Sequence, residues 1–195
     1  MVRRAQEARR RATCARARRR DKTAPYKVQP RDSLWAIAKR HATTSGAIKT
    51  VNKLTSDVIR VGATLNIPKG PFDVHVAKHT HTLQLLQEGK PVRTYTVALG
   101  ANNSTPSGTF TVENKLVDPV WYSDQGRIPA RDPRNMLGSR WIGFSGQIGI
   151  HGSRPAEETT MGTDASKGCV RMRDKDVKEL YEFVVEGKSK VTVVD

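Results

Sequence analysis

The chain has 195 residues, of which 34 are Lys or Arg and 19 are Asp or Glu, so its formal net charge is +15. This length accommodates one domain of ordinary size and a smaller one. The longest apolar run has five residues, so the sequence predicts no transmembrane helix. The basic N-terminus lacks the apolar stretch of a signal peptide, and no export signal is evident.

Much of the positive charge lies at the N-terminus. Residues 1–25 hold nine Arg and one Lys against one Glu and one Asp, a net charge of +8. Such a block predicts a disordered tail. It is either simply solvated or in contact with a polyanion such as nucleic acid, anionic lipid or a wall polymer. No base-reading motif accompanies it, so no specific nucleic-acid partner is predicted. Cys14, within this tail, is predicted to be an inert thiol.

Residues 26–69 show the pattern of a small strand–helix–helix–strand unit. After a short opening strand, Ser33 gives a helix start signal before the apolar run Leu34–Ala38. A second helix is predicted over Ser45–Asn52, and Val61–Pro68 returns as a strand that ends at proline.

This unit resembles a LysM carbohydrate-binding module. The matching stretches are Tyr26–Val28, Asp32–Ala38, Asn52, Val61–Leu65 and Ile67-Pro68. The resemblance implies that two loops grip the N-acetyl groups of glycan chains, largely through backbone amides. The glycan contacts it implies are Asp32, Ser33, Asp57 and Ile59. The alternative is a packing domain without a ligand. Trp35, inside the apolar run, is predicted to lie in the core.

Beyond the short linker Lys69–Pro71, the pattern becomes β-rich. Strands are predicted over Phe72–Ala77, Thr82–Gln87, Val92–Leu99 and Thr109–Val112, with a hairpin turn at Glu88–Lys90.

A helix and a last strand are predicted near the C-terminus. The apolar residues of the helix recur at helical spacing at Val177, Leu180, Tyr181 and Val184. Asp174 is predicted to cap this helix and Gly187 to end it. Val191–Val194 is the predicted final strand.

A cysteine and a histidine carry the strongest chemical signal. Cys169 stands in the stretch Ser166–Met172, and His151 lies 18 positions upstream. A thiol needs a neighbouring base or positive field to react as thiolate. A histidine can take its proton, because the unperturbed pKa of histidine is about 6.5. Gly168 lets the backbone turn tightly and can direct N–H groups at an oxyanion. The combination predicts acyl transfer through a thiol.

These motifs resemble the YkuD-type L,D-transpeptidases, bacterial enzymes that cross-link peptidoglycan. The matching stretches are Thr105–Phe110, Asn135–Trp141, Ile150–Ser153 and Ser166–Met172. The resemblance covers roughly residues 72–195. It implies a mainly β fold, with a YkuD-type β-sandwich catalytic domain over residues 70–195 after the small βααβ LysM module. Lys167 stands where many members have a second histidine, so His151 is the base candidate within the motif.

The resemblance implies a mechanism. Cys169 is the nucleophile, His151 the general base, the Gly152 carbonyl orients the imidazole, and the N–H groups of Gly168 and Cys169 hold the oxyanion. The thiolate attacks the carbonyl of the third stem residue and expels D-alanine. The amine of another stem then opens the thioester, which forms a 3→3 cross-link. Opening by water would make the protein an L,D-carboxypeptidase, and a non-catalytic LysM wall-binding protein is a further alternative.

Four more residues are candidates for substrate contact. They are Arg171, Ser166, Arg140 and Trp141. A guanidinium binds carboxylates in bidentate fashion, so Arg171 either orients the donor stem or forms a structural ion pair beneath the loop. Ser166 is also expected to hydrogen-bond within the loop.

The remaining histidines do not indicate a metal site. His75, His79 and His81 cluster without a Cys or carboxylate at motif spacing, so solvent-exposed histidines are predicted there. No metal or organic cofactor is implied. The expected partners are peptidoglycan and carbapenem inhibitors, and the expected state is a monomer in the cell envelope.

Overall fold

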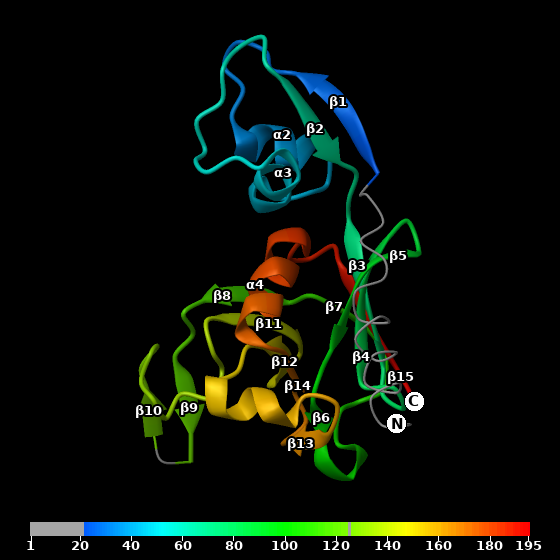
Figure 1. The fold of residues 1–195 in the computed structure, drawn as a ribbon, viewed down its shortest axis with the longest axis vertical. Helices are drawn as coiled ribbons and strands as arrows, with labels where there is room; N and C mark the ends of the chain where they lie inside the picture. The colour runs from blue at the N-terminus through cyan, green and yellow to red at the C-terminus, as the bar shows by residue number, and fades with distance from the viewer. Residues whose placement is uncertain (1–21, 125) are drawn as a thin grey trace, which may run out of the picture.

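The computed structural model describes residues 22–124 and 126–195, so most of the predicted tail, with Cys14, lies outside the described residues. Figure 1 shows two parts along the long axis of the molecule. They are an N-terminal module of residues 22–70 and a larger C-terminal domain of residues 71–195.

The N-terminal module has the βααβ order that the sequence predicts. Its elements are β1 (Thr23–Lys27), α2 (Leu34–Arg40), α3 (Ser45–Asn52) and β2 (Thr64–Pro68). Strands β1 and β2 pair antiparallel. The Ser33 hydroxyl accepts the Ala36 N–H at 3.2 Å, and Thr44 caps α3 in the same way. Both helices therefore begin where a side chain satisfies an N–H that has no partner within the helix.

Three details of the module differ from the sequence prediction. Strand β1 begins at Thr23, so residues 23–25 belong to the strand and not to the tail. Strand β2 begins only at Thr64, because Gly62, with φ of 85°, lies in a preceding turn. Trp35 is 66% exposed and not in the core, because α2 buries Leu34, Ile37 and Ala38 on its other side.

Two sheets and one helix form the C-terminal domain. The first sheet has the order β5 (Lys90–Thr96), β4 (Thr82–Gln87), β3 (Phe72–Ala77), β15 (Lys190–Val194) and β7 (Gly108–Thr111). The second has the order β14 (Val170–Arg171), β12 (Ile148–His151), β11 (Arg140–Ser145) and β8 (Asn114–Val117). Buried residues of both sheets and of α4 (Asp174–Phe183) form one core. The prediction of a mainly β fold is confirmed.

Shorter elements surround these sheets. They are β6 (Leu99–Gly100), η1 (Ala101–Asn103), β9 (Trp121–Ser123), β10 (Gly126–Ile128), η2 (Pro155–Thr160) and β13 (Asp164–Ser166). Strand β13 runs parallel to β6 and leads directly into the loop that carries Cys169.

Two boundaries of the C-terminal domain differ from the prediction. The strand predicted over Val92–Leu99 is split, because Ala98 leaves the first sheet and exchanges backbone hydrogen bonds of 2.9 and 2.8 Å with Arg171. Asp174 is the first residue of α4 and not its cap; its carboxylate is bound elsewhere, and Arg173 is at the N-cap. The helix ends at Phe183, before Gly187.

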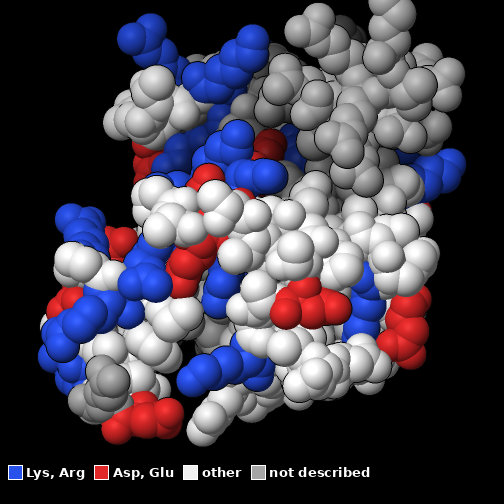
Figure 2. Space-filling view, turned by 60° about the horizontal axis from the view of Figure 1, so that its bottom comes forward, with Lys and Arg blue, Asp and Glu red and all other residues white. Residues whose placement is uncertain are grey.

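The described part of the chain contains no helix that is long and apolar enough to cross a membrane. On the face shown in Figure 2, Lys and Arg side chains are interspersed with Asp, Glu and uncharged surface. They do not gather into one basic stripe on this face.

Candidate active site

Strand register places three site residues in one row. Trp141 of β11 faces His151 of β12, and His151 is in register with Arg171 of β14. Because side chains alternate between the faces of a strand, these three lie on one face of the second sheet. The neighbouring row of Ile142, Ile150 and Val170 is fully buried in the core. The site residues therefore lie on one face of the sheet and the core residues on the other.

His151 is buried, oriented and neutral. Its side chain is 4% exposed, and Nδ1 lies 2.6 Å from the Gly152 carbonyl oxygen, which is the contact predicted from the sequence. Because a carbonyl oxygen only accepts, Nδ1 carries the proton and Nε2 is the basic nitrogen. Burial lowers the pKa of His151 to about 4, with the positive charge of Arg171 contributing in the same direction. Near neutral pH the imidazole is therefore an unprotonated base.

Trp141 forms the neighbouring surface of the site. Its ring stacks beside that of His151, with centroids 6.1 Å apart and an angle of 17° between the planes. The indole Nε1–H donates to Asn114 Oδ1 at 2.9 Å. The ring covers the α-carbons of Gly143 and Gly149, where a Cβ atom would collide with it. The glycines of β11 and β12 thus provide the space that the indole fills.

Arg140 does not contribute to this face. It precedes Trp141 in β11, so its side chain points to the other side of the sheet. There its guanidinium lies 5.3 Å from the ring centroid of Tyr181 in α4 and donates to the Ser139 carbonyl. The prediction that Arg140 contacts substrate is therefore not supported, because strand alternation directs it at the helix.

Cys169 directly precedes β14 and lies on the face of Arg171 and His151. Its Sγ contacts the Gln147 carbonyl oxygen at 3.8 Å. Burial raises the pKa of the Cys169 thiol, while the Gly149 N–H and the Arg171 charge act in the opposite direction. At rest the thiol and the imidazole are therefore both neutral, so attack by the thiol requires that its proton leaves.

The Cys169 loop is held from within by Ser166. The Ser166 hydroxyl donates to the Cys169 carbonyl at 2.6 Å and accepts the Gly168 N–H at 3.2 Å. Ser166 is 6% exposed and organises the loop, which is one of its two predicted roles; its contact with substrate stays a prediction. In this structure the Gly168 N–H is thus engaged by Ser166, and the oxyanion roles of the Gly168 and Cys169 N–H groups stay predictions. Gly168, with φ of 130°, makes the turn possible.

Arg171 is a buried cation whose Nε has no hydrogen-bond partner among the described residues, although its charge acts on Glu157. It is 5% exposed, and within the described residues its guanidinium forms no ion pair and its Nε has no hydrogen-bond partner. A buried charge is normally paired, because leaving it unpaired is costly. Of its two predicted roles, the structural ion pair is therefore not found. An anionic group of a ligand would satisfy it.

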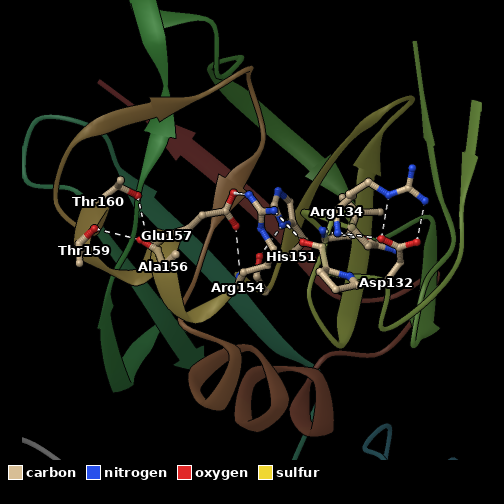
Figure 3. A network of polar contacts seen from close by, with 12 residues as sticks. Asp132, Arg134, His151, Arg154, Ala156, Glu157, Thr159 and Thr160 are labelled. Carbon is tan, nitrogen blue, oxygen red and sulfur yellow. Dashed lines mark hydrogen bonds and ion pairs between the residues drawn. The ribbon is translucent and has the colours of Figure 1, made fainter. Parts of the chain in front are cut away.

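Arg154 and Glu157 are site residues that the sequence interpretation missed. Figure 3 shows Arg154 between His151 and Glu157, which belongs to η2. Arg154 donates to Glu157 at 2.8 Å and to the Pro133 carbonyl at 2.8 Å, which ties η2 to the loop before β11. Although burial opposes it, the pKa of Glu157 is lowered by hydrogen bonds from Arg154 and by the charge of Arg171. The position of Arg154 three residues after His151 is the signal that could have identified it.

Asp174 links α4 to the histidine turn. Its Oδ1 accepts the Ser139 N–H at 2.8 Å. The same oxygen lies against the α-carbons of Gly138 and Gly152, where any Cβ atom would collide with it. The glycines in both motifs thus allow one carboxylate to fix the two segments that flank His151.

In the N-terminal module, most of the side chains predicted to contact glycan are occupied. The Asp32 carboxylate accepts from the Tyr26 hydroxyl at 2.7 Å, the Gln29 N–H at 2.8 Å and Arg40 at 2.5 Å. Ser33 caps α2. Asp57 is exposed and forms an ion pair with Lys49 at 2.7 Å. Ile59 packs partly on the core of the module. Glycan binding by this loop region stays a prediction, and backbone groups are its better candidates.

The histidine cluster makes no metal site within the described residues, where no group of three potential ligands is found. His79 is exposed, as predicted. His81 is less exposed than predicted, because its Nε2 lies 2.9 Å from Asp164 Oδ1.

A thiol, an oriented neutral imidazole and a buried cation on one sheet face define a site suited to thiol-dependent acyl transfer. The family model of the L,D-transpeptidase catalytic domain (YkuD) matches residues 71–193, and that of the LysM domain matches residues 26–68. The chain therefore belongs to the L,D-transpeptidase family, with a LysM domain before its catalytic domain. Both resemblances found in the sequence are confirmed.

Relatives and solved structures agree with this assignment. Two proteins that carry the family's name are YqjB of Bacillus subtilis, 35% identical over 66% of this chain and 74% of its own, and YkuD of Bacillus licheniformis, 29% identical over 83% and 94%. An L,D-transpeptidase structure from Mycobacterium smegmatis has a TM-score of 0.55 at 22% identity, covering 70% of this chain and 65% of its own. At that identity the structure supports the fold alone.

Proposed function

We propose that the protein is a peptidoglycan L,D-transpeptidase that forms 3→3 cross-links through a thioester on Cys169. It acts at the wall in the cell envelope, held there by its LysM module. The observation that carries the proposal is that His151 and Arg171 are in register on neighbouring strands, with Cys169 directly before β14 and on the same face by strand alternation.

The first half-reaction forms the thioester. His151 Nε2 takes the thiol proton as Sγ attacks the carbonyl carbon of the third stem residue. The tetrahedral oxyanion is stabilised by the Cys169 N–H; losing one such donor typically costs about 3 kcal/mol of barrier. When the intermediate collapses, the C–N bond breaks and the D-alanine amine leaves with the proton from the imidazolium.

The second half-reaction returns the thiol. The side-chain amine of a second stem attacks the thioester and passes its proton to His151 Nε2. The C–S bond breaks, a new amide links the two stems, and the thiolate recovers its proton. Arg171 supports both halves by binding a stem carboxylate, for which its Nε has a donor without a partner among the described residues.

Incubation of peptidoglycan with the full chain, followed by mass spectrometry of the released muropeptides, tests this function. We expect dimers joined between two third residues, together with free D-alanine. Tripeptides without such dimers would show an L,D-carboxypeptidase, and an unchanged profile would show a non-catalytic wall-binding protein.

Carbapenems provide a second probe of the same site. A solved L,D-transpeptidase 3 of Mycobacterium tuberculosis is described with a faropenem-derived adduct. We expect a carbapenem to acylate Cys169 here, because its strained carbonyl can occupy the oxyanion position. Intact-protein mass spectrometry should show the mass of one carbapenem on the wild type and none on Cys169→Ala. A label that maps elsewhere would contradict this expectation.

A further inference from the structure

One glutamine of the C-terminal domain holds both ends of the N-terminal module. Gln87, at the end of β4, is 2% exposed. Its Nε2 donates to the carbonyls of Lys22 at 2.8 Å and Lys69 at 2.9 Å, and its Oε1 accepts the Lys22 N–H at 2.7 Å. Lys22 directly precedes β1 and Lys69 directly follows β2. A single buried amide thus joins the segments by which the chain enters and leaves the module.

The next residue, Glu88, connects the same two segments through ion pairs. The Glu88 carboxylate pairs with Lys22 Nζ at 2.6 Å and with Lys69 Nζ at 3.0 Å. These two lysines lower the pKa of Glu88 to about 2. Exposed ion pairs contribute little individually, so we assign the main restraint to Gln87 and a supporting role to Glu88.

The second contact between the two parts is helical. Ala47 of α3 is fully buried and belongs to the core of the C-terminal domain, and Val51 packs against that core. The Thr44 hydroxyl donates to the Glu182 carbonyl near the end of α4. Because the module shares a core with the C-terminal domain and is bound at both ends, it is docked.

Helix α4 separates the docked module from the active site. Its first residue, Asp174, binds beside the His151 turn, and Glu182 lies at the module. With 10 residues, α4 is about 15 Å long, and α3 adds a helix-packing distance of about 8–10 Å. The connection from α3 to β2, which includes the predicted glycan loop at residues 56–59, runs along the outer edge of the module (Figure 1). A four-residue stem spans at most about 14 Å.

We propose that the docked module is a fixed platform and that the sugar it grips is never the one whose stem reacts at Cys169. The enzyme holds one point of the wall and cross-links stems at a set distance from it, on a neighbouring strand or further along the same strand. This inference rests on the proposed function, because it concerns the stems that reach Cys169.

Competition with a free glycan tests the offset between module and site. The full chain is assayed for D-alanine release from a disaccharide tetrapeptide and from insoluble peptidoglycan, with and without saturating N-acetylglucosamine tetramer, whose binding is first measured by calorimetry. With the tetramer present, we expect kcat/KM for the disaccharide tetrapeptide to stay within about two-fold of its value without the tetramer. On insoluble peptidoglycan it should reduce turnover about ten-fold or more, because the anchor's effective concentration is lost.

The opposite results would overturn the proposal. If the tetramer slows the disaccharide tetrapeptide reaction as well, one short ligand spans both sites and the offset is wrong. If the tetramer does not bind, or leaves turnover on insoluble peptidoglycan unchanged, the module is not a platform. A wild-type chain that releases no D-alanine from either substrate would instead refute the proposed function.

Docking itself is tested without activity. Nitrogen-15 relaxation of the full chain should give one tumbling time for both parts, and Gln87→Leu should give a shorter time for the N-terminal module. Gln84→Leu, a neighbouring change on β4 that removes no contact with the module, is the matched control. Two separate tumbling times in the wild type would overturn the docking.

Discussion

The two parts of the molecule treat a buried charge in opposite ways. In the N-terminal module, the carboxylate of Asp32 receives three hydrogen bonds, from Tyr26, Gln29 and Arg40. In the C-terminal domain, Arg171 is more deeply buried, yet no partner for its Nε is found among the described residues. Since burying a polar group is costly unless it is paired, the first arrangement stabilises the fold, and the second agrees with the proposal that Arg171 binds a ligand.

The largest effect is expected at the nucleophile. Cys169→Ala should abolish D-alanine release from tetrapeptide stems, because no other group on the site face can form the thioester. A colorimetric D-alanine assay measures this, with Cys14→Ala as the control that keeps wild-type activity. Comparable rates for Cys169→Ala and the wild type would place the chemistry elsewhere.

Removing the base should have the next largest effect. His151→Ala should lower turnover by roughly 10²–10⁴-fold, which is the usual contribution of a general base. Single-turnover acylation is the appropriate measurement, because it isolates the step in which the thiol loses its proton. A loss smaller than ten-fold would mean that another group takes this proton.

Substitutions of Arg171 and Asp32 test this comparison directly, because one should affect catalysis and the other stability. Arg171→Met should lower kcat/KM about 10–100-fold, because a charged hydrogen bond to substrate contributes about 1.5–3 kcal/mol. Its melting temperature should stay the same or rise, since an unpaired buried charge is removed. Asp32→Asn should do the reverse: it should lower the melting temperature and leave kcat/KM on a free tetrapeptide unchanged.

The control for Arg171 is Arg173→Met, a nearby arginine that is more exposed and pairs with Asp176. Equal kinetic losses in the two arginine variants would remove the specific role of Arg171. A large fall in melting temperature for Arg171→Met would show that its charge is structural after all.

The smallest expected effect is the pH dependence of stability. The pKa of His151 is lowered to about 4 in the folded protein, while the unfolded chain titrates near 6.5. The unfolded state therefore binds more protons between these values, so stability is complete above pH 6.5 and falls as the pH decreases towards 4. The loss should be about 3 kcal/mol. Urea unfolding at several pH values should show it in the wild type, and His151→Gln should lack this component.

Sequence patterns predicted helices and strands well where apolar residues recur at regular helical or strand spacing. The apolar run Leu34–Ala38 with its Ser33 cap gave a helix, and the alternation in Phe72–Ala77 gave a strand. The central strands β11 and β12 were not predicted. Their alternation is hidden because Gly143 and Gly149 occupy positions that the indole of Trp141 covers.

Site residues could be predicted where a sequence motif contains them. They could not be predicted where their position depends only on how distant strands pair. The motif around Cys169 and His151 predicted the contact of His151 with the Gly152 carbonyl, which the structure has, and the catalytic roles of both residues stay predictions. The side of a strand on which Arg140 lies depends on pairing between distant segments, and so does the contact of Ser166 with its own loop. Exposure of Trp35 and docking through Gln87 depend on which face of an element meets the rest of the protein, and local sequence does not specify that face.

The most direct test of the mechanism is the mass of the enzyme during turnover. The full chain is mixed with a tetrapeptide stem without an acceptor amine, quenched in acid within milliseconds to seconds, and examined by intact-protein and peptide mass spectrometry. We expect an added mass equal to the acyl tripeptide on the peptide that contains Cys169, removed by hydroxylamine and absent in Cys169→Ala. D-alanine release without any such adduct at any quench time, or with an adduct on another residue, would contradict a thioester at Cys169.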